Sequence, residues 1–175
     1  MPTQLVAITG DPINLSDRIT VASEAQVTVR DALSEGAGYT VTIEYDTELE
    51  RFVATAVEVT RARTGSEITS RLIRELKIQE VITDVALRDL TTFYTADEEG
   101  PMGSMSGAEA LELVQPAAGR DPWVVREEAH LVHLLARLGS WPPLVTVAER
   151  LQVSHSTAKR LVAAKRWDPL ESVDG

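Results

Sequence analysis

Residues 146–166, TVAERLQVSHSTAKRLVAAKR, constrain the fold most strongly, because their apolar positions repeat at helical spacing on both sides of a short break. These positions are Val147, Ala148 and Leu151 before the break and Ala158, Leu161 and Val162 after it. About three residues, Gln152 to Ser154, lie between the two groups, which is the length of the turn in a helix-turn-helix. The pattern therefore predicts two short helices that share one small core.

Capping signals indicate where both helices begin and where the second one ends. Thr146 and Glu149 have the spacing of a capping box, in which both side chains bind free backbone N–H groups at a helix start. Ser154 is a suitable N-cap for the second helix, since its hydroxyl can accept from N–H groups two and three residues later. Asp168-Pro169 should stop that helix, because the residue before a proline disfavours helical geometry.

The solvent side of the second helix is expected to be cationic. Its first half carries His155, Ser156, Lys159 and Arg160, and Lys165 and Arg166 follow. No acidic residue lies between Ser154 and Trp167. In a DNA-binding helix-turn-helix the second helix lies in the major groove, where its N-terminal residues contact base edges and nearby basic or hydroxyl side chains hold phosphates.

About 20 of the 175 residues resemble a known family pattern. The matching positions are Val147-Ala148-Glu149, Val153-Ser154 and Ser156-Thr157-Ala158-x-Arg160-Leu161. They are similar to the helix-turn-helix of LacI-type repressors and of small actinobacterial and phage DNA-binding proteins. The sequence departs from that pattern at Gln152, where such turns commonly carry glycine, so the turn must accept a side chain there at some cost in strain.

The resemblance assigns roles to individual residues. It implies that His155, Ser156 and Arg160 contact bases. It also implies that Ser154, Thr157 and Lys159 lie near phosphates, and we add Thr146, Lys165 and Arg166 to the expected phosphate contacts. The architecture of LacI itself does not transfer, because its motif is N-terminal and precedes a sugar-binding domain that this chain is too short to hold.

Charge is divided unevenly along the chain. Residues 1–121 contain 10 basic and 21 acidic residues, whereas residues 122–175 contain 7 and 6, so the two parts carry net charges of −11 and +1. An isolated DNA-binding domain is typically strongly basic. We therefore expect modest affinity for DNA from one copy, and a requirement for dimerisation or a partner.

The N-terminal region, residues 1–92, is predicted to be an acidic α+β domain. Residues 39–45 alternate between apolar and polar side chains, and residues 52–60 do so again, with Val53, Val57 and Val59 on one side and Phe52 on the other. Together they predict a β-hairpin. Ser66 should cap a following amphipathic helix that bends near Lys77. Residues 1–35 are ambiguous: residues 5–8 could form a short strand, whereas residues 19–33 fit neither period cleanly.

The remaining chain is predicted to be a tether followed by a helical domain. Residues 93–120 are rich in glycine, proline and acidic residues and read as a flexible linker, apart from a short helical stretch at residues 108–114. Asp121-Pro122 then predicts the start of a helix whose apolar stripe is Val124, Leu131, Leu134, Leu135 and Leu138. The expected fold is α+β, with an all-α trihelical helix-turn-helix domain at residues 121–168 and a tail at 169–175.

Other site chemistry finds little support in the residues. Glu127, His130 and His133 have helical spacing, but zinc usually needs a further protein ligand and the remaining histidine lies on the basic helix. The acids at residues 44–50 fit a solvated hairpin loop. The chain has no cysteine and no phosphate-loop or nucleophile-elbow motif, so we expect neither an enzyme nor a bound cofactor or metal.

The expected function is sequence-specific binding of double-stranded DNA, as a transcriptional regulator of phage or mobile-element type. The hairpin domain would bring two copies together as a homodimer. An alternative is an interaction adaptor whose acidic N-terminal domain binds a basic protein. Neither an apolar run of membrane-spanning length nor a signal peptide is evident, so a cytoplasmic location is expected.

Overall fold

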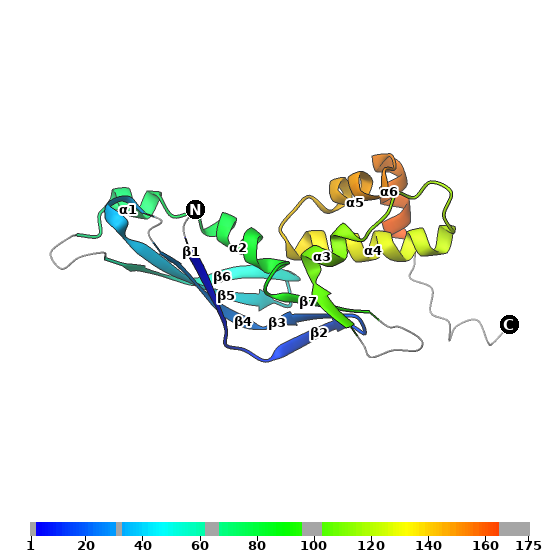
Figure 1. Cartoon of the computed structure of the whole chain (residues 1–175). Coiled ribbons are helices and arrows are strands. Elements are labelled where there is room, and N and C mark those ends of the chain that lie inside the picture. Colours follow the sequence, from blue (N-terminus) through cyan, green and yellow to red (C-terminus); the bar gives the residue numbers. More distant parts are fainter. Residues whose placement is uncertain (1–2, 31–32, 62–66, 96–102, 165–175) are drawn as a thin grey trace. The chain divides into compact units, whose positions relative to one another are not determined.

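The computed structural model of the chain describes residues 3–30, 33–61, 67–95 and 103–164. The chain divides into two compact units (Figure 1). The sheet unit comprises Met1–Ala110 with Leu138–Ser140, and the helical unit comprises Leu111–Arg137 with Trp141–Gly175. Each unit is described by itself.

The first antiparallel sheet has four strands in the order β1-β4-β5-β6. They are β1 (Thr3–Ile8), β4 (Glu24–Arg30), β5 (Gly38–Asp46) and β6 (Arg51–Thr60). Alternate residues of β4 and β5 are buried, as the period of two in their sequence requires. Val27 pairs with Val41 across these strands, and both are fully buried.

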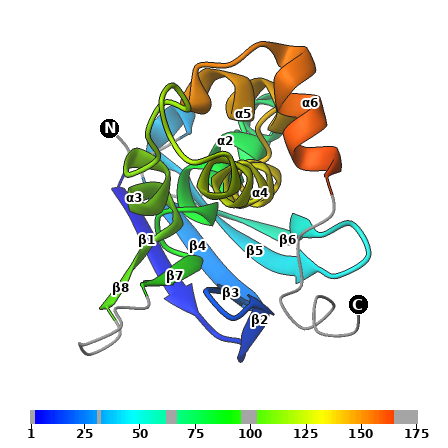
Figure 2. The same cartoon turned by 90° about the vertical axis from the view of Figure 1, so that its right-hand side faces the viewer.

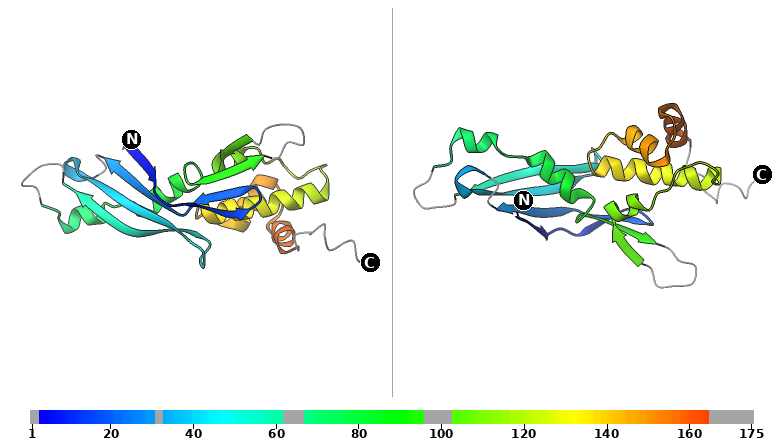
Figure 3. Two further views of the ribbon diagram at one scale, coloured as in Figure 1. Left: turned by 90° about the horizontal axis from the view of Figure 1, so that it is seen from below. Right: turned by 45° about the horizontal axis from the view of Figure 1, so that its top comes forward.

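A second antiparallel sheet has the order β2-β3-β7-β8. Its strands are β2 (Pro12–Ser16), β3 (Ile19–Ala22), β7 (Thr91–Thr95) and β8 (Gly103–Ser106). Ser23 alone separates β3 from β4, so one extended segment passes from one sheet to the other (Figure 3). The Ser23 carbonyl accepts a hydrogen bond from Tyr45 N–H (2.9 Å) at this crossing.

Two helices pack on the first sheet, α1 (Ser70–Arg74) and α2 (Ile78–Ala86), with Lys77 between them in a non-helical conformation. The predicted bend near Lys77 is therefore confirmed. Thr69 is the N-cap of α1, and Ser66, the expected cap, lies outside the described residues. A short 3-10 helix, η1 (Ser34–Gly36), precedes β5.

The helical unit contains the end of α3 (Gly107–Glu112) and three further helices. These are α4 (Pro122–Leu138, of which the last residue is assigned to the sheet unit), α5 (Pro143–Leu151) and α6 (His155–Ala163). The Asp121 carboxylate accepts from Trp123 N–H (2.7 Å) and Val124 N–H (3.3 Å), which confirms the predicted cap of α4. Ser106 and Glu109 form a reciprocal capping box on α3 that the sequence pattern did not reveal.

The predicted fold class is wrong in both halves. The N-terminal region is built from two four-stranded antiparallel sheets, in which the expected hairpin supplies only β5 and β6. The C-terminal region is not a separate trihelical domain, because the helical unit begins at Leu111, within the expected linker. Arg150 donates to the Leu111 carbonyl (3.4 Å) and pairs with Glu112 (3.2 Å), so this part of the expected linker is packed structure.

The predicted faces of β6 are also wrong. The pairing of β5 with β6 shifts register between Thr42 and Ile43, which leaves Thr55 as an extra residue in β6. Cross-strand partners share a face, so Phe52, opposite Tyr45, lies on the same side as Val57. An alternation counted along the sequence cannot detect such a bulge.

The buried face of α4 is turned by about one residue from the prediction. Val125 is 6% exposed, whereas Val124 is 39% exposed and Trp123 is 50% exposed. Leu135 and Leu138 are fully buried, as expected. The small residues Ala129 and Ala136 complete the buried stripe. Their apolar signal in the sequence was too weak to show which face of α4 is buried. None of the helices among the described residues has the length and apolar character needed to cross a membrane.

Candidate nucleic-acid interface

The first helix of the pair begins earlier than the sequence indicated. α5 starts at Pro143, so Thr146 lies inside the helix and not at its N-cap. Its hydroxyl donates to the Pro142 carbonyl (3.0 Å), and the residue is only 9% exposed. The expected capping box with Glu149 therefore does not form, because proline at the first helical position starts the helix without a side-chain cap.

The turn between the helices is tight and depends on Gln152. This residue has φ 52° and ψ 46°, the left-handed conformation that glycine usually supplies at a helix end. The conformation lets Val153 N–H donate to the Ala148 carbonyl (3.0 Å), which closes α5. The turn was expected to accept a side chain at this position at some cost in strain. For a residue other than glycine, such as Gln152, this left-handed backbone conformation costs about 1 kcal/mol or more.

The second helix begins as predicted. Ser154 is extended at φ −65° and ψ 153°, and its hydroxyl accepts from Thr157 N–H (3.2 Å). The same hydroxyl lies 2.9 Å from the hydroxyls of Ser156 and Thr157. Three hydroxyl groups therefore gather at the start of α6, where the helix dipole favours an anion.

A small apolar core holds the two helices together. Val147 and Leu151 of α5 and Ala158 of α6 are fully buried. α6 lies beside α5 (Figure 2), and the small side chain of Ala158 suits such an approach of the two helices. The opposite side of α6 is thereby fixed toward solvent.

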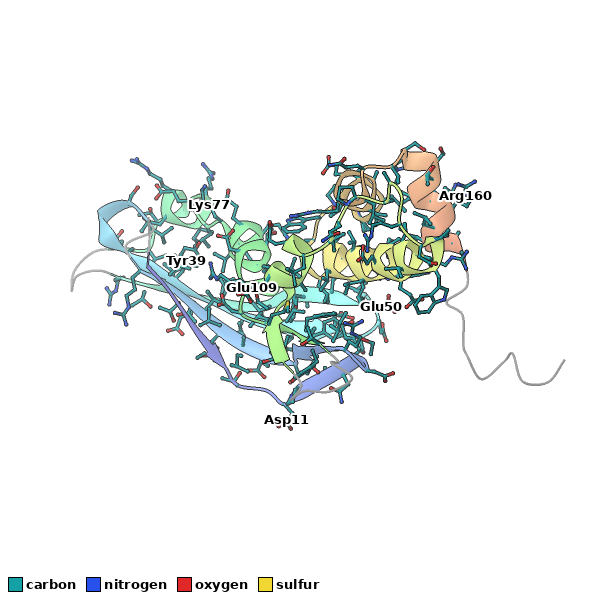
Figure 4. All side chains as sticks on the ribbon, turned by 45° about the vertical axis from the view of Figure 1, so that its right-hand side comes forward. Asp11, Tyr39, Glu50, Lys77, Glu109 and Arg160 are labelled. Atoms are coloured by element: carbon teal, nitrogen blue, oxygen red, sulfur yellow. The ribbon has the colours of Figure 1, made fainter. Side chains whose placement is uncertain are left out.

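The predicted base-contacting residues all lie on that solvent side. His155, Ser156 and Arg160 are exposed, as is Lys159, and Thr157 is half-buried. Figure 4 shows Arg160 on the outer side of α6. Neither Lys159 nor Arg160 has an ion pair among the described residues. α6 ends at Ala163, so Lys165 and Arg166, as well as Trp167, fall outside the described part of the chain.

α4 supports the far end of α6 through a polar contact that the sequence did not reveal. His130 Nε2 lies 3.1 Å from the Ala164 carbonyl oxygen, which requires Nε2 to carry the proton. Burial, together with Arg137 and His130, lowers the pKa of His133, so His133 stays neutral at pH 7. Within the described ranges, no group of three or more acidic or histidine side chains is arranged to hold a metal ion.

The start of α4 is attached to the preceding loop by a second polar contact. Arg120 makes two hydrogen bonds to the Glu128 carboxylate, of 2.6 and 2.7 Å, and a third to the Gln115 carbonyl (3.0 Å). Both side chains are half-buried, and the carboxylate raises the pKa of Arg120. This paired charge stabilises the helical unit, whereas the charges of Lys159 and Arg160 on α6 remain available to an external anion.

The acidic hairpin loop has a structural explanation. The Asp46 carboxylate accepts from the N–H groups of Glu48 (2.9 Å) and Leu49 (2.8 Å), which shapes the turn into β6.

Comparison of the chain with models of protein families, with curated proteins and with solved structures found no significant match.

Proposed function

We propose that the protein binds double-stranded DNA sequence-specifically, with α6 in the major groove. The observation that carries this proposal is the exposed cationic side of a short helix whose other side is fixed by a fully buried core. His155, Ser156 and Arg160 would contact base edges, since they lie in the first half of α6. The protein would therefore act by binding, without catalysis.

Phosphate contacts are assigned to the residues around the start of α6. Ser154 and Thr157 supply hydroxyl groups and Lys159 supplies a charge, while Lys165 and Arg166 would extend the contact beyond the described residues. Thr146 is left out of this set because its hydroxyl is used by the Pro142 carbonyl. The resemblance to the helix-turn-helix of LacI-type repressors supports the same roles, and with them a transcriptional regulator of actinobacterial or phage type acting in the cytoplasm.

We propose that the active form is a homodimer assembled through the sheet unit. β6 is an outer strand of ten residues, and its uncharged middle section includes Val57, which is 37% exposed. An exposed edge strand of this kind is suited to pairing with another chain. Two copies of α6 would then contact two half-sites, which raises affinity above that of one weakly charged unit. Analytical ultracentrifugation of the full chain tests this point.

The decisive experiment selects genomic DNA fragments with the full chain at several salt concentrations and sequences those retained. We expect enrichment of a sequence with two-fold symmetry, and affinity that falls as salt rises. Lys159→Ala/Arg160→Ala should lower the affinity for that site about a hundredfold, since it removes one base contact and one phosphate contact. The matched control is Arg71→Ala/Arg74→Ala, which removes two exposed arginines from α1 and should leave binding unchanged.

The proposal would be refuted if no DNA fragment bound to the full chain at low salt. It would also be refuted if the two double variants bound the selected DNA equally well. An adaptor function is the second candidate, favoured by the excess of acidic over basic residues in the first 121 residues, 21 against 10. In that case the full chain should bind a basic protein in a salt-dependent manner that Lys159→Ala/Arg160→Ala does not alter.

A further inference from the structure

His130 lies in the middle of α4 and bonds to the end of α6, the helix proposed to contact DNA (Figure 1). Its Nε2 atom is 3.1 Å from the carbonyl oxygen of Ala164, a residue 34 positions later in the chain. The neighbours of His130 on α4, Ala129 and Val132, are fully buried. The part of α4 that carries this histidine is therefore packed, and the imidazole reaches α6 from a firmly held backbone.

Ala164 is the residue at which α6 ends. Its backbone is extended, at φ −66° and ψ 129°, and its N–H donates to the Arg160 carbonyl (3.2 Å), which closes the last helical turn. The last carbonyl groups of a helix have no donor within the helix and take one from elsewhere. His130 supplies the donor for Ala164, as basic side chains commonly do at the C-terminal end of a helix.

Two successive hydrogen bonds thus connect α4 to Arg160, which is proposed to contact a base. The first joins His130 to Ala164, and the second joins Ala164 to Arg160. The Arg160 side chain is exposed on the turn that these bonds close. At the other end of α6, the Ser154 hydroxyl accepts from Thr157 N–H. Polar contacts therefore hold α6 at both of its ends.

The contact made by His130 does not require a charged imidazole. A neutral ring with its proton on Nε2 donates to the carbonyl, and a doubly protonated ring donates in the same way. His133 lies almost one turn later on α4 and is also half-buried, but it makes no hydrogen bond to α6 among the described residues. The two histidines therefore differ in this bond, which makes His133 a matched control.

We propose that His130 is a positioning residue for DNA recognition, an inference that rests on the proposed function of α6. It holds the last turn of α6, so that Arg160 presents its guanidinium group to the bases in one orientation. Base readout by arginine depends on bidentate geometry, whereas binding to phosphates depends mainly on charge. Loss of the His130 contact should therefore weaken binding to the preferred site more than binding to unrelated DNA.

Binding of the full chain to the site enriched from genomic DNA, and to a scrambled duplex at the same salt concentration, tests this role. His130→Leu keeps an apolar side chain of similar size but removes the donor, and it should lower affinity for the enriched site about tenfold. Affinity for the scrambled duplex should change less than about twofold. His130→Gln should restore most of the loss, since its amide can donate to the Ala164 carbonyl. His133→Leu should bind both duplexes as the unaltered chain does.

Hydrogen exchange of the DNA-free chain, followed by nuclear magnetic resonance, tests the contact separately. In His130→Leu the Ala164 amide should exchange several-fold faster, because the turn that it closes has lost its support. The Val153 amide, which donates to the Ala148 carbonyl at the end of α5, should keep its protection. An equal increase at both amides would overturn the proposal, because His130 would then support the whole helical unit and not the end of α6.

The DNA measurements can fail in three distinct ways. Equal affinity of His130→Leu and the unaltered chain for the enriched site would overturn the positioning role and leave the proposed function intact. Equal losses in His130→Leu and His130→Gln would also overturn it, because the effect would not follow the hydrogen bond. If the unaltered chain bound no DNA, the proposed function would fail, and this role would fail with it.

Discussion

The segment of α1 and α2 in the sheet unit and the helix α6 in the helical unit hold their basic residues in different ways. In the sheet unit, Lys77 lies 2.8 Å from Glu80 and Arg71 lies 3.5 Å from Glu75, so these cations are compensated by neighbouring acids. On α6, Lys159 and Arg160 stand on a helix without any acidic residue. Compensated charges serve the fold, whereas uncompensated charges are available to an external anion such as DNA.

The units also differ in the elements that form their cores. Ile43 of β5 is fully buried and pairs with Ala25 of β4 and Ala54 of β6. Leu151 is a fully buried residue at the end of α5, which α6 follows in the chain. Shortening a buried side chain in one core should therefore destabilise that core and leave the other core unchanged.

The largest expected effect comes from Leu151→Ala. Removing a fully buried leucine side chain should lower the free energy of unfolding of the helical unit by about 3 kcal/mol. Hydrogen exchange followed by mass spectrometry should show faster exchange in α5 and α6, while β4 and β5 keep their protection. Ile43→Ala is the matched control and should have the reverse pattern. Equal loss of protection in both units with either variant would show that the two cores unfold together.

The next largest effect concerns the charges of Lys159 and Arg160 on α6. If α6 contacts DNA as proposed, Lys159→Ala/Arg160→Ala should reduce the slope of log affinity against log salt by about one for each phosphate that the variant no longer neutralises. Arg71→Ala/Arg74→Ala should leave the slope unchanged, although it removes as much charge. An equal change in slope for both variants would mean that net charge, and not the placement of the cations, governs binding.

A smaller effect is expected at the turn between α5 and α6. Gln152→Gly should raise the free energy of unfolding of the helical unit by about 1 kcal/mol, since glycine adopts φ 52° without strain. Chemical denaturation followed by circular dichroism measures the change. Gln152→Ala is the control, and it should give no such gain. A loss of stability in the glycine variant would mean that the Gln152 side chain makes a stabilising contact.

The smallest effect involves the Glu75 carboxylate. Hydrogen bonds from Ser34, assisted by Arg71, lower the pKa of Glu75 in the folded protein. Its contribution to stability is therefore present above the unfolded pKa and is lost as pH falls through the lower folded pKa. Glu75→Gln should lower the melting temperature at pH 7 and reduce its dependence on pH between about 5 and 3. Glu109 on α3 is a similarly bonded acid whose pKa is also lowered. Glu109→Gln should therefore change the pH dependence of the stability of α3 and not that of the segment around Glu75.

Local sequence signals were reliable where short-range geometry decides the outcome. The caps at Asp121 and Ser154 and the break near Lys77 were predicted from a few neighbouring residues, and the unusual demand on Gln152 from the resemblance to a helix-turn-helix pattern. The signal at Thr146 failed because Pro142-Pro143 offered an earlier helix start. Threonine inside a helix can bond to a carbonyl four residues back, and Thr146 does so.

Pairing between segments that are distant in the sequence could not be predicted from such local signals. Residues 93–120 read as a linker by composition, yet β8 pairs with β7 and α3 carries its own capping box. Residues 19–33 gave no clean period, because β3 and β4 run together across Ser23 while they belong to different sheets. The bulge at Thr55 likewise depends on which strand lies opposite.

The sequence by itself determined the α5–α6 pair, the cap of α6 and its cationic side, because each depends on interactions within a few residues and on a helical period that the apolar positions display. The tertiary structure alone decided how the eight strands of the described residues divide into two sheets, how the end of α3 joins the helical unit, and that His130 of α4 bonds to Ala164 at the end of α6. These outcomes arise when segments distant in the chain bury surface together, and no local pattern encodes which segments will meet.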